Sequence, residues 1–73
     1  MLLDVATTGE KLKRFRRGRG MTQEELAEAS GVAQSTIAQI EGGRRPEPRP
    51  GTLKKLAGPL GLEIAELLDD VED

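Results

Sequence analysis

Apolar residues recur along this chain at the spacing of one helix face, in five short stretches that glycine or proline residues separate. No stretch alternates between apolar and polar residues as a half-buried strand would, and no segment is repeated. The spacing therefore predicts an all-α fold of five short helices. They run from about Gly9 to Arg17, from just after Thr22 to about Ser30, from Gln34 to Glu41, along Leu53, Leu56, Ala57 and Leu60, and along Ile64, Leu67 and Leu68.

The chain also carries signals for where these helices begin. Thr7 with Glu10, and Thr22 with Glu25, have the spacing of a capping box, in which two side chains satisfy free N–H groups at a helix start. The third helix lacks such a cap because Ala33 stands where Ser or Thr would serve, which weakens the helix start by about 1 kcal/mol. We therefore expect well-defined starts for the first two helices and a weaker start for the third.

Glycine and proline residues predict where regular structure stops. Gly31 suits the left-handed conformation of a sharp turn between the second and third helices. The stretch over residues 42–51 is dense in both residue types, so we expect it to be an irregular loop. Pro59 removes the backbone bond to Lys55 and restricts Gly58, so the fourth helix should kink or end early there.

Length and composition exclude several classes of function. A chain of 73 residues predicts one domain over residues 1–73, with an ordered core of about residues 8–68 and an acidic tail over residues 69–73 that frays. Without Cys or His the chain has no disulfide, no thiolate or imidazole metal ligand, and no Ser-His or Cys-His nucleophile pair. We therefore expect no enzyme activity, no metal and no cofactor. The first residues form neither a signal peptide nor a membrane span, which predicts a cytoplasmic protein without a membrane partner.

The net charge of −2 conceals a strong segregation of charge along the chain. Six basic residues lie between Lys11 and Arg19, five lie between Arg44 and Lys55, and the residues from Glu63 onward carry six acids and no base. Without residues 63–73 the bases outnumber the acids by four. Such segregation creates a local basic surface that attracts an anionic polymer. The charge pattern supports DNA binding but does not establish it.

Residues 23–42 combine a helix, a glycine turn and a second helix, with apolar or small residues at Leu26, Ala27, Val32, Ile37 and Ile40. This order resembles the helix-turn-helix of the phage repressor and Cro (Xre-type) family. The similarity extends over most of the chain, through residues 12–16, 20–27, 40–44, 53–57 and 60–62. It implies a lambda-repressor-like fold and a transcriptional regulator, with repression as the expected sign, that binds double-stranded DNA in a sequence-specific way.

The third helix has a face suited to base recognition. If Ile37, Ile40 and Glu41 face inward, the outward face carries four uncharged residues, Gln34, Ser35, Ala38 and Gln39. Glutamine can pair with adenine through two hydrogen bonds, serine can donate or accept, and alanine can contact a thymine methyl group. A solvated helix face normally carries Lys and Glu, so we expect these four residues to contact base edges in the major groove.

A second group of residues is expected to bind phosphates. Gln23 opens the second helix, where free N–H groups favour an anion, and the resemblance implies that its side-chain amide donates to the same phosphate. Gly42 and Gly43 let the backbone approach a phosphate closely, and Thr22 serves mainly as a cap. The full set of candidate phosphate-binding residues is Thr22, Gln23, Thr36, Gly43, Arg44 and Arg45.

Arg16 and Glu41 have the character of structural residues. Each occupies the i+4 position of an otherwise apolar stripe, so each is expected to be partly buried and to need a partner. They can supply each other. The resemblance implies this same ion pair, which ties the first helix to the end of the third.

Dimeric binding is expected because one recognition helix specifies only a few base pairs. Two copies would bind a near-palindromic operator through successive major grooves. The short fifth helix carries more apolar residues than a small core absorbs, and its flanking acids predict a weak homodimer. The candidate dimer interface is Leu62, Ile64, Leu67, Leu68 and Val71.

Two other functions remain open on the sequence alone. The same fold could serve as an antitoxin or adaptor module whose acidic, apolar C-terminal segment binds a protein partner. Binding of single-stranded RNA is disfavoured because the one aromatic residue, Phe15, is expected in the core and leaves no platform for base stacking.

Overall fold

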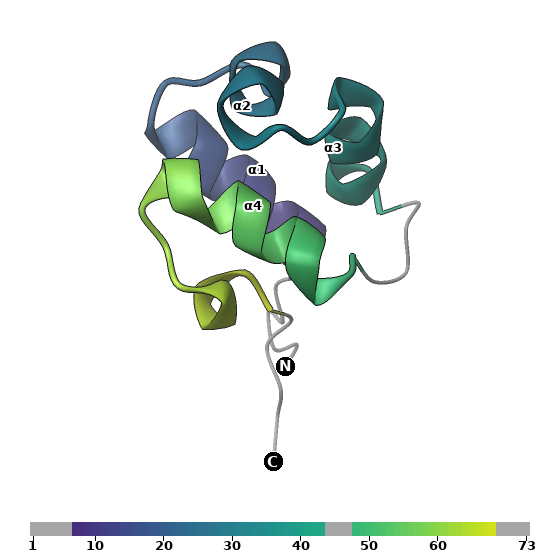
Figure 1. Ribbon diagram of the computed structural model, residues 1–73, viewed down its shortest axis with the longest axis vertical. Coiled ribbons are helices and arrows are strands. Elements are labelled where there is room, and N and C mark those ends of the chain that lie inside the picture. The colour runs from purple at the N-terminus through teal and green to yellow at the C-terminus, as the bar shows by residue number, and fades with distance from the viewer. Residues whose placement is uncertain (1–6, 44–47, 69–73) are drawn as a thin grey trace, which may run out of the picture.

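The chain folds into a cluster of short helices (Figure 1). The computed structural model describes residues 7–43 and 48–68, and within them it contains four α-helices, one 3₁₀-helix and no strand. They are α1 (Thr8–Gly18), α2 (Gln23–Ser30), α3 (Gln34–Glu41), α4 (Pro50–Leu60) and the 3₁₀-helix η1 (Ile64–Leu67). The predicted all-α fold is confirmed, and the predicted bounds of the first three helices hold to within one residue.

Local side-chain bonds explain where α1 and α2 begin. The Glu10 N–H donates to the Thr7 hydroxyl at 3.1 Å, and the Glu10 carboxylate accepts from the Thr7 N–H at 2.9 Å. Thr22 and Glu25 repeat this pattern at 3.0 and 2.8 Å. Both predicted capping boxes are therefore confirmed, and Gly31 ends α2 in the left-handed conformation at φ 78°.

Helix α4 differs from its prediction at both ends. It begins at Pro50, inside the stretch that we expected to be irregular, because proline at the first helical position lacks only an N–H that has no helical partner there. It also continues through Pro59 to Leu60, so it does not end early. Pro59 lies in the last turn, where it removes one backbone bond, and Gly61 at φ 70° then ends the helix.

The predicted fifth helix is shorter and tighter than an α-helix. It is the 3₁₀-helix η1, which covers four residues and leaves Leu68 outside it. Tight turns of this kind rarely exceed four residues, because their hydrogen bonds are poorly aligned. The predicted short fifth helix is therefore present as a four-residue 3₁₀-helix, and it ends one residue before Leu68.

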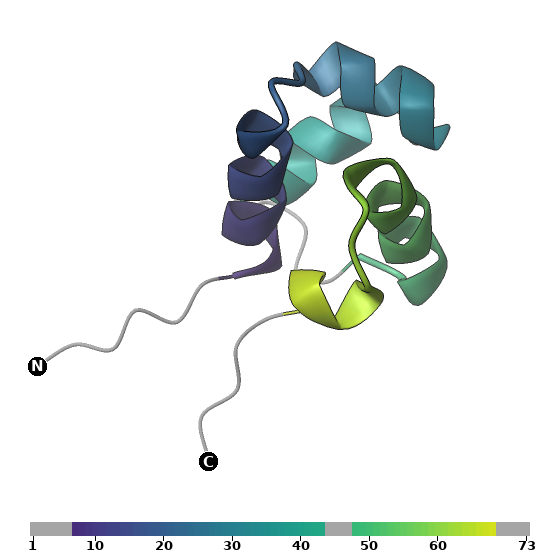
Figure 2. The same cartoon turned by 90° about the vertical axis from the view of Figure 1, so that its left-hand side faces the viewer.

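The helices enclose one hydrophobic core to which all five elements contribute. Packing contacts run from α1 to α3, to α2, to α4, to η1 and back to α1, which closes a ring around the core (Figure 2). The fully buried side chains of this core are Leu12, Leu26, Ile37, Leu56, Leu60 and Leu67. Because α3 lies in this ring between α1 and α2, its orientation is fixed by both neighbours.

The start of α1 packs directly on the backbone at the end of α3. A Cβ atom at Gly9 would overlap the Ile40 carbonyl oxygen and lie 3.3 Å from the Cα of Glu41. Backbone atoms cannot rotate away as a flexible side chain can, so this approach requires glycine. Gly9 therefore sets how closely α1 and α3 pack.

The end of η1 is held by α1. The Lys11 ammonium group donates to the Leu68 carbonyl oxygen at 2.8 Å, which satisfies a backbone acceptor where η1 ends. Among the described residues, no helix is long and apolar enough to cross a membrane.

Replacing Gly9 by alanine should lower the free energy of unfolding by about 1 to 3 kcal/mol, because the added methyl group forces α1 away from α3. Thermal and chemical unfolding measure this change. Gly18→Ala on the same helix is the matched control, since no atom other than the adjacent backbone of α1 lies within 4 Å of a Cβ there. Equal stability of the two variants would contradict the close packing at Gly9.

Candidate nucleic-acid interface

Helices α2 and α3 form a helix-turn-helix over residues 23–41. The two helices pack on each other, and the turn between them contains Gly31. In this turn the Ser30 hydroxyl accepts a hydrogen bond from the Val32 N–H at 3.1 Å. No side chain caps the start of α3 at Ala33, as the sequence predicts. The N–H groups that open α3 therefore lack a side-chain cap of their own.

Helix α3 divides into a buried face and an exposed face. Ile37 and Ile40 are 0% and 2% exposed, so the helix is fixed against the core through them. The four predicted base-contacting residues, Gln34, Ser35, Ala38 and Gln39, are all exposed. The structure brings these four together on one uncharged surface that a partner can reach.

The predicted phosphate-binding residues lie in different environments. Gln23 is half-buried at the first position of α2, and its amide nitrogen donates to the Glu41 carboxylate at 3.1 Å. Thr22 is exposed and engaged as the cap of α2, Thr36 is half-buried, and Gly43 is exposed with φ 75°. Arg44 and Arg45 lie outside the described residues.

Arg16 and Glu41 form a buried ion pair with two hydrogen bonds. The Arg16 Nε donates to Glu41 Oε2 at 2.7 Å, Nη2 donates to Glu41 Oε1 at 2.9 Å, and Nη1 donates to the Met21 carbonyl oxygen at 2.7 Å. The two side chains are 8% and 4% exposed. The pair thus joins α1 to the end of α3, and Gln23 adds the start of α2 to the same carboxylate.

This arrangement keeps both groups charged. Burial raises the pKa of Glu41, but hydrogen bonds from Arg16 and Gln23 outweigh this effect, so its pKa lies below the ordinary value of a glutamate. The hydrogen bond to Glu41 raises the pKa of Arg16. The glutamate therefore stays ionised at neutral pH and can bind its partners as a carboxylate.

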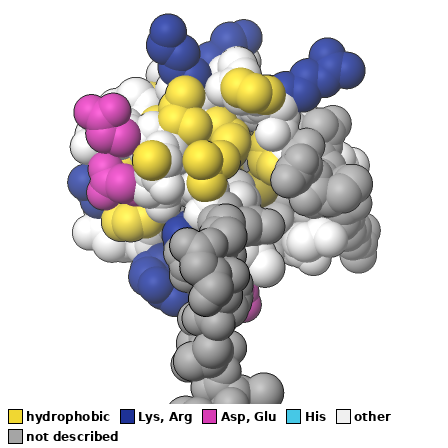
Figure 3. All heavy atoms as spheres, turned by 90° about the horizontal axis from the view of Figure 1, so that it is seen from below, with side chains coloured by type: hydrophobic (Ala, Val, Ile, Leu, Met, Phe, Trp, Pro, Cys, Tyr) yellow, Lys and Arg dark blue, Asp and Glu magenta, His cyan; other side chains and the backbone are white. Residues whose placement is uncertain are grey.

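The proposed dimer surface needs one correction. Leu67 is 0% exposed because the tight turn of η1 directs it into the core between α1 and α4, so it cannot contact a second copy. Leu62 and Ile64 are half-buried, Leu68 is 46% exposed, and Val71 lies outside the described residues. Figure 3 shows apolar side chains gathered on the underside of the molecule, with charged groups around them.

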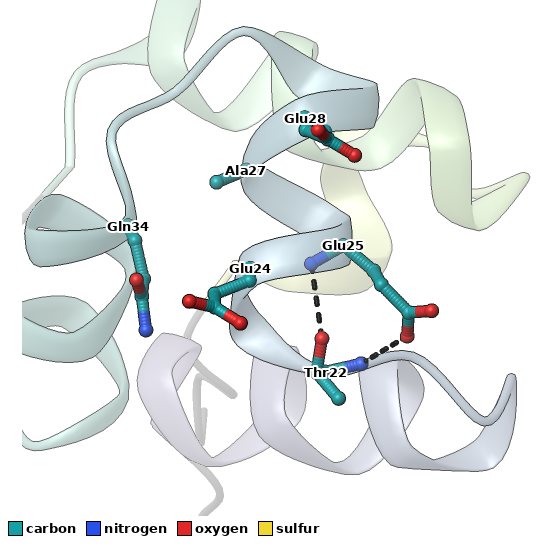
Figure 4. Close-up of a pocket in the computed structure, with 6 residues that line it drawn as sticks. All are labelled: Thr22, Glu24, Glu25, Ala27, Glu28 and Gln34. Carbon is teal, nitrogen blue, oxygen red and sulfur yellow. Dashed lines mark hydrogen bonds between the residues drawn. The ribbon is translucent and has the colours of Figure 1, made fainter.

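The sequence did not reveal a shallow depression between α2 and the start of α3 (Figure 4). It is lined by Thr22, Glu24, Glu25, Ala27, Glu28 and Gln34. The Glu24 side chain extends across it toward Gln34, whereas Glu28 points away from Gln34. Glu24 and Ala27 are three residues apart, so they lie on one side of α2. The sequence alone does not show that this side faces the start of α3.

The helix-turn-helix family HTH_3 matches residues 12–67, which is more than half of the chain. The chain therefore belongs to the helix-turn-helix family. It is 42% identical over 60 residues to the HTH-type transcriptional repressor RghR of Bacillus subtilis (strain 168), a match that covers 82% of this chain and 44% of that protein. The chain thus spans less than half the length of this curated relative.

Solved structures have the same fold. The crystal structure of SinR, a master regulator for biofilm formation, in complex with DNA matches with a TM-score of 0.81 and 31% identity over 84% of this chain and 97% of that chain. The SinR/SinI protein complex matches with a TM-score of 0.82 and 32% identity, over 85% of this chain and 60% of that chain. The chain therefore shares the fold of a protein that has been crystallised in complex with DNA.

Replacing either Arg16 or Glu41 by alanine should cost about 3 to 5 kcal/mol of unfolding free energy at neutral pH, because each change leaves a buried charge without its partner. A double-mutant cycle by chemical denaturation should give a coupling above about 0.5 kcal/mol. Additive losses would show that the two residues act independently.

The pH dependence of the same variants provides the control. Because the pKa of Glu41 is lowered by folding, its stabilisation is present above the ordinary value of 4.5 and is lost as the pH falls through the lower value of the folded state. The loss caused by Arg16→Ala should therefore be full at neutral pH and should shrink below pH 4.5. A loss that is independent of pH would indicate packing and not charge.

Proposed function

We propose that this chain is the DNA-binding part of a sequence-specific transcriptional repressor, which inserts α3 into the major groove of double-stranded DNA. The observation that carries this proposal is the exposed face of α3, which holds four uncharged residues while its opposite face is anchored in the core. Its relatives support the proposal, since RghR is named a repressor and SinR binds DNA in a crystal. The domain acts by binding alone, without catalysis or a cofactor, in the cytoplasm.

Base recognition is assigned to the exposed face of α3. Gln34 and Gln39 each pair with adenine through the amide oxygen and nitrogen, and Ala38 contacts a thymine methyl group. Ser35 donates or accepts, according to the base edge that it meets. An uncharged surface suits this role because it contacts base edges without repelling the phosphates on either side.

Phosphate contacts hold the helix in register. Gln23 donates one amide hydrogen to Glu41, and its second amide hydrogen is the one proposed to bind a phosphate at the start of α2. Further phosphate contacts come from Thr36, Gly43, Arg44 and Arg45. The positive φ of Gly43 lets the backbone turn sharply at that place. Thr22 contributes as the cap that orders this helix start.

We propose that two copies bind a near-palindromic operator as a weak homodimer. One α3 helix offers only four exposed side chains, so one copy specifies too few base pairs against genomic competition. The apolar surface centred on Leu68, with Ile64 and Leu62 at its edge, is the proposed contact. Glu63 and Glu66 are exposed beside it, and their repulsion between copies keeps the dimer weak.

A second candidate function is protein binding through the same surface. The 46% exposure of Leu68 favours it, because a large apolar side chain at the surface suits a partner interface. The SinR/SinI complex shows that a protein with this fold binds a protein partner. An antitoxin or adaptor role would use this surface in place of a second copy.

Replacing Gln34 or Gln39 by alanine should weaken binding to the preferred duplex by about 1 to 3 kcal/mol and leave binding to random duplex nearly unchanged. Titration of each variant against both duplexes measures the difference. The melting temperature serves as the control and should hardly move, since both side chains are exposed. Equal losses on the two duplexes would exclude a role in base recognition.

Sedimentation should find the free protein largely monomeric at low concentration and two copies on each operator. Leu68→Asp should reduce the cooperativity of operator binding without unfolding the protein, because this side chain is 46% exposed. A complex of one copy that retains full sequence specificity would refute the dimer.

A further inference from the structure

One acidic residue lies where a DNA-binding surface would be expected to avoid negative charge. Glu24 is exposed at the second position of α2 and lines the depression that separates α2 from Gln34, the first residue of α3. Its side chain extends toward Gln34 (Figure 4). A carboxylate at this place repels DNA phosphates, so its presence needs a reason.

The neighbouring acids of α2 have other positions. Glu25 accepts from the Thr22 N–H in the capping box at 2.8 Å, and Glu28 points away from Gln34. Negative charge at a helix start is favourable in itself, but that effect does not distinguish Glu24 from Glu25. Among the three acids of α2, only Glu24 combines an exposed carboxylate with a direction toward a residue proposed to contact bases.

We propose that Glu24 is a positioning residue that fixes the orientation of the Gln34 side-chain amide, and thereby sets the base preference of α3. This inference rests on the proposed function. A glutamine bound to adenine uses its amide oxygen and the amide hydrogen on the same side, which leaves the second amide hydrogen without a base partner. Glu24 accepts that second hydrogen when the protein is on DNA.

The consequence for recognition follows from the geometry of an amide. Turning the amide by half a rotation exchanges its donor and acceptor, and the reversed order no longer matches the adenine edge. A carboxylate accepts from the nitrogen side only, so it stabilises one orientation and disfavours the other. A hydrogen bond to a charged acceptor is stronger than a neutral one, which lets one exposed residue bias the choice.

The experiment compares Glu24→Ala with Glu28→Ala, which removes the same charge from the same depression. The experiment uses four duplexes that differ only at the base pair whose preference Gln34→Ala abolishes. The readout is the ratio of two dissociation constants, that of the least favoured duplex divided by that of the preferred duplex. We expect Glu24→Ala to lower this ratio by about fivefold or more and Glu28→Ala to leave it unchanged. Both variants should bind all duplexes somewhat more tightly at low salt, because each removes a negative charge.

Two further variants test whether Glu24 acts as a pure acceptor and whether it acts through Gln34. Glu24→Gln keeps the size of the side chain, but its amide can donate as well as accept, so it fits both orientations of the Gln34 amide and should lower the base preference as Glu24→Ala does. In a Gln34→Ala background, Glu24→Ala should have no effect on the ratio.

Several results would overturn the proposal. A change in affinity that is equal for all four duplexes in Glu24→Ala, or an equal loss of preference in Glu28→Ala, would make Glu24 a general electrostatic residue. If Gln34→Ala abolishes no base preference at all, the proposed role of α3 fails and this inference fails with it.

Discussion

The buried ion pair of Arg16 and Glu41 is the interaction on which the functional surface depends. Glu41 is the last residue of α3, and its carboxylate accepts hydrogen bonds from α1 through Arg16 and from α2 through Gln23. Gly9 adds a close backbone contact at the same end of α3. An exposed helix can contact bases reproducibly only if its own position is fixed, and these contacts supply that rigidity.

In the proposed mode of binding, the surface that recognises sequence is separate from the groups that supply affinity. The exposed residues of α3 carry no charge, while exposed cations such as Lys13, Arg14 and Arg17 lie on α1. Contacts between basic groups and phosphates supply affinity that does not depend on sequence, and base contacts supply discrimination. On this proposal, placing the two on different elements lets a protein with a net charge of −2 bind DNA through a local surface.

Local signals made the first three helices predictable, whereas features that depend on packing were not. The capping boxes at Thr7 and Thr22 and the apolar spacing of α3 mark their elements without reference to the rest of the chain. Pro50 suits either a loop or the first turn of a helix, and only its tertiary context decides between them. Three features arise from contacts between segments that are distant in the sequence, so no local pattern predicts them. They are the burial of Leu67, the need for glycine at residue 9 and the hydrogen bond from Gln23 to Glu41.

Selection of bound sequences from a random duplex library tests the central claim, that the exposed face of α3 reads DNA, most directly. The account predicts enrichment of a near-palindromic site whose half-site centres lie about 10 base pairs apart. It further predicts adenine at the positions that change when the selection is repeated with Gln34→Ala or Gln39→Ala. A library that emerges without any enriched sequence, or an enriched site that neither substitution alters, would contradict the claim.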